Sequence, residues 1–235
     1  MNENNSSAPI VRLSSVTKIY KQGQVEVKAV DALALEINKG EFSALCGPSG
    51  SGKTTTLNLI GALDIPSSGD IMLEDKNLRD LSRTELSRLR RDRIGFVFQA
   101  YNLVQVLTAY ENAEFVLNLQ GVPRAERRER TMALLKEVGL AGMENRRPDE
   151  LSGGQQQRVA IARAIAPEPA IVLADEPTAN VDSATAGALL DLMEKLNQEK
   201  GVTFLFSTHD ERVMRRAKRI MTMRDGRLVG DEAKN

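Results

Sequence analysis

The chain has 235 residues, enough for one large or two small domains, and its hydrophobic fraction of 41% is typical of a globular protein. Because 32 Lys and Arg residues balance 32 Asp and Glu residues, the net charge gives no reason to expect a nucleic-acid partner. One cysteine, Cys46, excludes an internal disulfide, and without a signal-peptide pattern or an apolar run of roughly 18 residues we expect a cytosolic protein.

Short apolar strands alternate with helices along the chain. The polar residues 1–9 predict a disordered tail. Apolar runs predict strands at 10–16, 27–37, 41–46, 94–99, 170–176, 202–209, 219–225 and 227–230. Helical spacing begins after residue 53 and recurs at 83–91, 111–120, 124–139, 154–166, 183–198 and 210–217. This alternation indicates an α/β fold with a parallel sheet covered on both faces.

One stretch, residues 99–164, differs from the rest of the chain. It is mainly helical and carries much of the arginine. We therefore expect a single domain over residues 10–235, in which a helical subdomain at about 99–164 is inserted into a core of about 10–98 and 165–235.

The sequence GPSGSGKTT, residues 47–55, lies between a predicted strand and a predicted helix. A helix N-terminus offers unpaired N–H groups, glycines let the backbone fold around an anion, and Lys53 adds a positive charge. The spacing of Gly47, Gly52, Lys53 and Thr54 fits the P-loop pattern, in which the hydroxyl binds Mg²⁺. A flexible turn rich in Gly and Ser is the simpler alternative, but the flanking strand and helix favour nucleotide binding.

Four predicted strands end in chemically useful residues. The strand at 41–46 runs into the phosphate loop, and the others end at Gln99, at Asp175 and Glu176, and at His209. Because ligands bind beyond the carboxyl ends of strands in open α/β sheets, we expect one rim lined with these groups. Adjacent strand side chains point to opposite sides, so one carboxylate can hold Mg²⁺ while the other faces the attacking water. A solvated strand end for the acidic pair and a packed histidine are the alternatives.

A second glycine-rich helix start, LSGGQQQR, occupies residues 151–158. Capping of the helix by Ser152 is the simpler interpretation. The same arrangement is suited to an anion, so one chain carries two phosphate-binding elements about a hundred residues apart. In a twofold pair of chains, each chain could lend this second loop to the nucleotide of the other.

Taken together, these motifs resemble those of the ATP-binding subunits of ABC transporters, over about residues 10–230. The stretch 47–55 resembles Walker A, IVLADE at 171–176 resembles Walker B, and LSGGQ resembles the ABC signature. The resemblance implies a P-loop NTPase core with a mostly parallel sheet, an antiparallel β subdomain and an inserted helical subdomain.

Single residues extend the resemblance. Gln99 and His209 occupy the Q-loop and H-loop positions, and Asn180 to Asp182 match the D-loop. Tyr20 stands where the family stacks an aromatic ring on adenine, although an ordinary strand-end aromatic is the simpler reading of Tyr20 alone.

The family implies a head-to-tail dimer that holds two ATP molecules with Mg²⁺. The resemblance makes Glu176 the general base, His209 a support for the γ-phosphate and the attacking water, and Lys53 a contact to the β- and γ-phosphates. It assigns Mg²⁺ to Thr54, Gln99 and Asp175, and counts Lys53, Gln99, Glu176 and His209 as catalytic. It places ATP against Tyr20, Gly47, Pro48, Ser49, Gly50, Ser51, Gly52, Lys53, Thr54 and Thr55 of one chain and Ser152, Gly153, Gly154 and Gln155 of its partner.

The resemblance also implies an integral-membrane permease subunit, which would hold the chain on the inner face of the cell membrane. The stretches GALDIPSSGDI, NLVQVLTAYEN and DEPTANVDS are similar to those of the group serving lipoprotein release, macrolide and peptide export, and cell-division complexes. Gln105, Ala179 and Val181 depart mildly from that group. An ATPase of a non-transporting membrane signalling or septal complex is one alternative, and an ABC factor of DNA repair or translation is another.

Apolar residues after Gln99 carry a further expectation. Five of them, Leu103, Val104, Val106, Leu107 and Tyr110, are too many for an ordinary solvated loop. They either pack inside the helical subdomain or line a groove for a helix of the membrane subunit.

Overall fold

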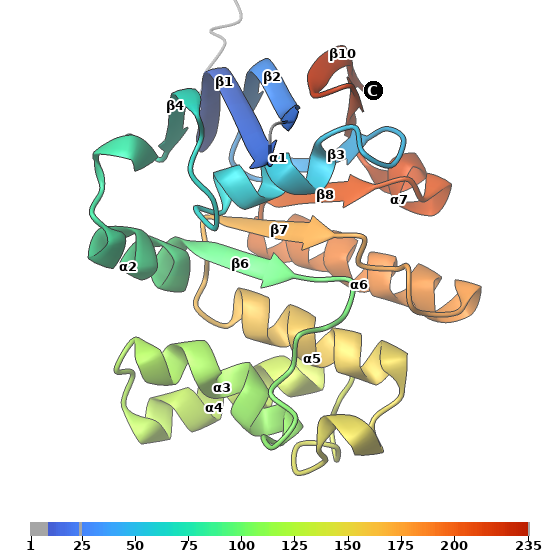
Figure 1. The fold of residues 1–235 in the computed structure, drawn as a ribbon. Helices are drawn as coiled ribbons and strands as arrows, with labels where there is room; N and C mark the ends of the chain where they lie inside the picture. Colours follow the sequence, from blue (N-terminus) through green and yellow to red (C-terminus); the bar gives the residue numbers. More distant parts are fainter. Residues whose placement is uncertain (1–8, 24, 235) are drawn as a thin grey trace, which may run out of the picture.

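The computed structural model describes residues 9–23 and 25–234, so all of the predicted disordered tail except Pro9 lies outside the described residues. Two sheets lie one above the other, with helices below them (Figure 1). The larger sheet has six strands in the order β10-β9-β3-β8-β7-β6. Its parallel strands are β3 (Phe42–Cys46), β6 (Ile94–Val97), β7 (Ile171–Asp175), β8 (Phe204–Thr208) and β9 (Arg219–Arg224), and β10 (Arg227–Ala233) pairs antiparallel to β9.

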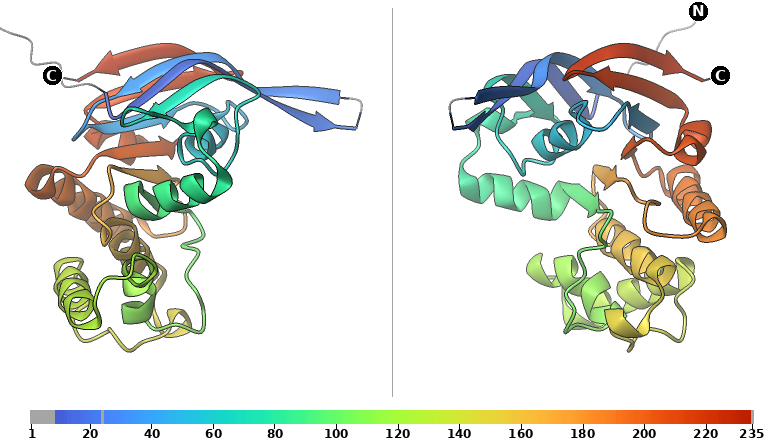
Figure 2. Two further views of the ribbon diagram at one scale, coloured as in Figure 1. Left: turned by 90° about the vertical axis from the view of Figure 1, so that its left-hand side faces the viewer. Right: turned by 45° about the vertical axis from the view of Figure 1, so that its right-hand side comes forward.

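The smaller sheet is antiparallel, in the order β2-β1-β4-β5. Its strands are β1 (Val11–Gln22), β2 (Val25–Ile37), β4 (Ser68–Leu73) and β5 (Lys76–Asn77). The hairpin of β1 and β2 projects beyond the rest of the molecule (Figure 2). The sequence analysis missed β4 and β5, because β4 has only two fully buried residues and β5 is only two residues long.

Helices fill the space between the sheets and cover the free face of the larger one (Figure 1). Helix α1 (Lys53–Ile60) lies between the two sheets, and α2 (Arg83–Arg93) follows the smaller sheet. Helices α5 (Gly153–Ile165) and α6 (Ser183–Lys200) cover the opposite face, with α3 (Ala109–Leu119) and α4 (Arg124–Glu137) beyond α5. Short helices occupy Leu78–Asp80, Pro148–Glu150 and, as α7, Glu211–Arg216.

Two hydrophobic cores lie on the two faces of the larger sheet, because neighbouring strand residues point to opposite sides. Phe42, Phe204 and Phe206 pack with the helices α3 to α6, whereas Leu45 and Leu205 pack with α1 and the smaller sheet. The arrangement of a mostly parallel sheet, an antiparallel sheet and a helical layer confirms the expected fold class. Helices α3 and α4 share the first core with the sheet, and we propose the subdomain bounds 99–164.

Cys46 is a buried free thiol at the end of β3, as expected of a core residue, and burial raises its pKa to about 11. None of the helices in the part of the chain that the structure describes is long and apolar enough to cross a membrane.

Candidate active site

The carboxyl ends of four strands meet at one edge of the larger sheet. The strand register places Cys46 opposite Thr208, Asp175 opposite Ser207, and Val97 opposite Ala174. The phosphate loop, the segment after β6, the acidic pair and the only histidine therefore all leave the sheet at this edge. We call it the catalytic edge, and it is the rim that the sequence predicts.

The phosphate loop has a backbone that only glycine can adopt at two positions. Gly47 has a φ of 146° and Gly52 a φ of 99°, both outside the range that side chains favour. A Cβ on Gly47 would lie 2.2 Å from the carbonyl oxygen of Met223, and one on Gly52 would lie 2.3 Å from that of Ala29. The loop is therefore pressed against both sheets, at β9 and at β2, while its residues 48–50 are exposed.

The loop and the start of α1 suit a phosphate group. Gly52 caps α1 without a side-chain hydrogen bond, which leaves the first N–H groups of the helix available to an anion. The Ser51 hydroxyl is buried and has no hydrogen-bond partner among the described residues. Lys53 is buried and donates from Nζ to the carbonyl oxygens of Gly47 (2.8 Å) and Pro48 (3.0 Å). Pro48, Ser49 and Gly50 form the exposed turn of the loop, and Thr55 follows in α1.

The two acidic residues have different partners. Asp175, the last residue of β7, accepts a hydrogen bond from the Thr54 hydroxyl at 3.1 Å. This hydroxyl–carboxylate pair beside the phosphate loop is the oxygen-donor chemistry that Mg²⁺ requires. Gln99 lies in the exposed loop after β6, where its carbonyl oxygen accepts a 2.9 Å bond from Asn180. Gln99 thus follows β6, the strand that pairs with β7, and β7 ends at Asp175.

Glu176 faces the other side, toward β8. Its two carboxylate oxygens lie 2.6 Å from Nδ1 of His209 and 3.0 Å from the hydroxyl of Thr208, which donates to it. The Glu176 side chain is 16% exposed and that of His209 is 75% exposed. Glu176 also has a left-handed φ of 45°, and its N–H donates to the carbonyl oxygen of Ser207 at 2.9 Å. This strained, fixed carboxylate is typical of a functional site.

The Glu176–His209–Thr208 contacts were not anticipated from the sequence. The sequence predicts both Glu176 and His209 at the rim, but it gives no sign that one holds the other. The available signal was the Ser-Thr-His run at the end of a strand, since hydroxyl and imidazole N–H groups can both donate to a carboxylate.

The second glycine-rich motif caps α5, as its simpler interpretation predicts. The Ser152 hydroxyl accepts from the N–H of Gln155 at 3.3 Å, and the Gln155 side chain accepts from the N–H of Ser152 at 2.9 Å. This reciprocal pair is a capping box. No hydrogen bond among the described residues joins residues 152–155 to the phosphate loop, so the structure does not bring the two glycine-rich motifs of one chain together.

Both glycines of this motif are required by close packing. A Cβ on Gly153 would lie 2.7 Å from the hydroxyl oxygen of Tyr101, and one on Gly154 would lie 2.3 Å from a methyl of Thr185 in α6. The start of α5 is therefore held between the loop after β6 and the start of α6.

Tyr20 lies on β1, in the projecting hairpin, and its hydroxyl donates to Asp64 at 2.7 Å. The Nζ atom of Lys18 lies 4.9 Å from the centre of the ring, on one of its faces. Burial, together with the Asp64 carboxylate, raises the pKa of the Tyr20 hydroxyl. The ring is thus fixed by two neighbours.

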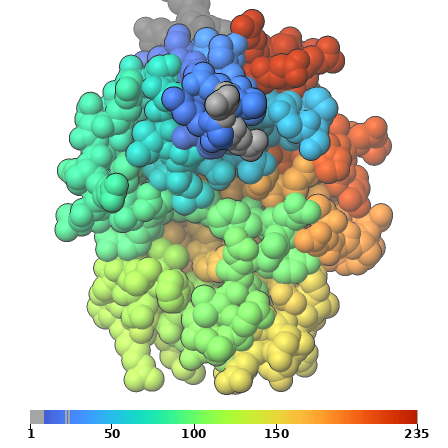
Figure 3. Space-filling model, in the orientation of Figure 1, coloured from blue at the N-terminus to red at the C-terminus, as the bar shows by residue number. Residues whose placement is uncertain are grey.

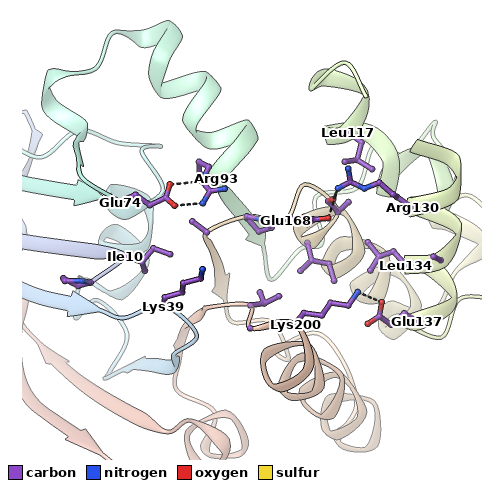
Figure 4. Close-up of a pocket in the computed structure, with 18 of the residues that line it drawn as sticks. Ile10, Lys39, Glu74, Arg93, Leu117, Arg130, Leu134, Glu137, Glu168 and Lys200 are labelled. Atoms are coloured by element: carbon purple, nitrogen blue, oxygen red, sulfur yellow. Dashed lines mark hydrogen bonds and ion pairs between the residues drawn. The ribbon is translucent and has the colours of Figure 1, made fainter. Parts of the chain in front are cut away.

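A cavity of about 980 Å³ lies at the opposite edge of the sheet, where β6, β7 and β8 begin (Figure 4). We call it the rear crevice. Apolar residues such as Ile10, Leu117 and Leu134 line it, and it contains none of the predicted site residues. Most of its cations form ion pairs, and these are Arg93 with Glu74, Arg130 with Glu168 and Lys200 with Glu137.

Comparison with known proteins places these features in one family. Residues 30–179 match the family model described as ABC transporter. Over 223 residues the chain is 44% identical to the "Macrolide export ATP-binding/permease protein MacB" of Hyphomonas neptunium, a match that covers 95% of this chain and 34% of that protein. The chain thus spans about a third of the length of that curated relative.

A relative of similar length comes from Methanocaldococcus jannaschii. Its "Uncharacterized ABC transporter ATP-binding protein MJ0796" is 45% identical over 227 residues, which cover 95% of this chain and 97% of the relative. A solved dimer of that ATP-binding cassette, bound to ADP and Pi in a post-hydrolysis state, has a TM-score of 0.89 and covers 96% of this chain and 99% of its own. The phosphate loop, the acidic pair and these matches together show that the chain belongs to the ABC transporter family, as one of its ATP-binding ATPase domains.

Proposed function

We propose that this chain is the ATP-hydrolysing subunit that drives a separate integral-membrane permease, for the export or extraction of a lipoprotein, peptide or drug-like substrate. The proposal of ATP hydrolysis rests on one observation, that the two adjacent carboxylates, Asp175 and Glu176, have different partners. Asp175 contacts Thr54 at the phosphate loop, whereas Glu176 is fixed by Thr208 and His209. One carboxylate is thereby available for a metal and the other for a proton.

Two chains act together in this proposal, arranged head to tail. The loop 47–55 binds the phosphates of ATP, with Lys53 at the β- and γ-phosphates, and Tyr20 stacks on the adenine. Ser152 and Gly154 of the second chain reach the same γ-phosphate. The 45%-identical solved cassette is a dimer, which supports this arrangement. So does the separation of the two glycine-rich motifs within one chain.

Glu176 takes the proton of the attacking water in the proposed reaction. The hydroxyl of Thr208 and the ring of His209 hold its carboxylate in one orientation, so no reorganisation is needed when the proton moves. His209 is largely exposed, and so can also contact the γ-phosphate. Thr54, Asp175 and Gln99 would hold Mg²⁺, which when bound neutralises charge on the phosphate oxygens.

The exposed apolar residues beyond Gln99 support a membrane partner. Val104, Val106, Phe115 and Leu119 are exposed, Val106 by 73%, whereas Leu103 is buried in the core. The segment that follows β6, green in Figure 3, lies at the surface on the front of the molecule. We infer that the exposed members receive a helix of the permease, and that this contact holds the chain on the inner face of the membrane.

The class of substrate rests on likeness alone. A relative 44% identical to this chain is named for macrolide export. The stretches GALDIPSSGDI and DEPTANVDS resemble those of the lipoprotein-release and export group. Reconstitution with the co-purifying permease tests this part, because a complex that hydrolyses ATP but moves no solute would favour a signalling or septal role.

The shared site is tested by mixing two inactive variants. Ser152→Arg and Lys53→Ala each damage both sites of a homodimer, but a mixed dimer keeps one site with an intact Lys53 and an intact Ser152. Random mixing should restore up to about a quarter of the wild-type ATPase activity, since half of the dimers are mixed and each has one good site of two. Mixed dimers that form but hydrolyse no ATP would overturn the head-to-tail arrangement.

The membrane contact is tested by a single charge. Val106→Glu should reduce co-purification with membranes at least about tenfold, because burying an unpaired carboxylate costs several kcal/mol. Its melting temperature and ATP binding should stay near normal, since the side chain is already exposed. Val229→Glu is the matched control, because Val229 is 59% exposed on β10. Equal membrane association of both variants would place the permease elsewhere.

A further inference from the structure

We propose that Tyr101 is a positioning residue that couples the two ATP sites, by joining Gln99 to the helix start that serves the partner's nucleotide. The inference rests on the head-to-tail dimer proposed above. It concerns a residue that the sequence analysis did not single out.

The first observation is the shape of the loop that carries Tyr101. Tyr101 and Asn102 are consecutive residues with left-handed φ values of 60° and 49°. Arg163 of α5 holds both, since its guanidinium donates to their carbonyl oxygens at 2.9 Å and 2.6 Å. Burial also lowers the pKa of the Arg163 guanidinium. The loop after β6 is therefore shaped by the helix that begins at Ser152.

The second observation is a pair of hydrogen bonds to one residue. The Tyr101 hydroxyl donates to the carbonyl oxygen of Asn180 at 3.1 Å. The Asn180 side chain donates in turn to the carbonyl oxygen of Gln99 at 2.9 Å. Gln99 and Tyr101 are thus tied to the same asparagine, which lies four residues beyond Glu176 in the chain.

The third observation is the contact of Tyr101 with α5. A Cβ on Gly153 would lie 2.7 Å from the hydroxyl oxygen of Tyr101 and 3.4 Å from the carbonyl oxygen of Asn180. Three segments therefore meet at this hydroxyl: the loop after β6, the residues after Glu176, and the start of α5. No side chain larger than hydrogen fits at Gly153 while they meet.

A movement of Gln99 consequently displaces the start of α5. Gln99 lies beside the nucleotide of its own chain in the proposed dimer, and Ser152 and Gly154 lie beside the other nucleotide. A rigid connection between them transmits the state of one site to the other. Removal of the Tyr101 hydroxyl loosens this connection but leaves the packed ring in place.

Tyr101→Phe in the full chain tests the proposal. We expect kcat to fall about fivefold, the factor that one ordinary hydrogen bond represents, while KM for ATP stays within about twofold. The Hill coefficient for ATP should fall toward one. Tyr110→Phe is the matched control, because among the described residues its hydroxyl bonds to Glu114 alone, one turn along α3. An unchanged kcat and Hill coefficient in Tyr101→Phe would overturn the proposal.

Mixed dimers separate coupling from a local effect. In a dimer of Ser152→Arg and Lys53→Ala chains, the Lys53→Ala chain supplies only its helix start to the working site. Tyr101→Phe added to that chain should lower turnover as much as when it is added to the other chain. A loss confined to the chain with the intact Lys53 would show that Tyr101 merely positions Gln99 for its own nucleotide. Inactive mixed dimers without Tyr101→Phe would instead refute the shared site itself.

Discussion

The two edges of the larger sheet differ in how their charged groups are satisfied. At the rear crevice Arg93, Arg130 and Lys200 each pair with a carboxylate, although the cavity measures about 980 Å³. At the catalytic edge the buried Lys53 donates to backbone carbonyl oxygens and, among the described residues, forms no ion pair. A large cavity volume alone therefore does not identify the place where ATP is hydrolysed. A buried charge without a counter-charge is a better sign.

The largest expected effect is at the catalytic edge. Glu176→Gln should lower kcat by roughly 10²–10⁴-fold, because the amide keeps the shape of the carboxylate but cannot accept the proton. ATP binding should persist, and phosphate release and nucleotide titration measure the two quantities separately. Lys53→Ala should lose ATP binding itself. Normal turnover in the Glu176→Gln variant would contradict the assignment of Glu176 as the general base.

The second largest effect is expected from a glycine substitution in the phosphate loop. Gly47→Ala should weaken ATP binding by at least about tenfold, since its Cβ would lie 2.2 Å from a backbone oxygen and the loop must move by more than a rotamer change. Gly50→Ala is the control, because its φ of 79° is also left-handed but its Cβ would meet nothing within 4 Å. Equal losses of affinity, measured by titration, would mean that backbone strain and not the close contact decides.

The smallest effects are expected in the rear crevice. Arg93→Ala removes a side chain that forms two hydrogen bonds with Glu74, yet both groups are more than a third exposed and solvent screens them. The free energy of unfolding should fall by about 1 kcal/mol or less, as seen in urea titrations, and Lys200→Ala should cost still less. ATPase activity should stay within about twofold for both. A larger loss of ATPase activity would show that the rear crevice contributes to catalysis.

Much of the fold could be predicted because the relevant signals are local. The buried strands β3, β7 and β8 are short apolar runs, and their periodicity identifies them without a tertiary structure. The strands β4 and β5 escape this signal, since β4 is only partly buried and β5 spans two residues. Their pairing with β1 supplies the missing stabilisation, and pairing is not visible in a local window.

The residue types at the catalytic edge can be recognised in the sequence alone: the glycine loop, the adjacent carboxylates and the lone histidine at strand ends. Those residue types carry their chemistry wherever the chain puts them. The contacts of Asp175 with Thr54 and of Glu176 with His209 appear only in the folded chain. The tertiary structure also decided that Tyr101 reaches Asn180, 79 residues away. The physical reason is that such hydrogen bonds depend on strand register and helix packing, which the whole chain sets and no short stretch encodes.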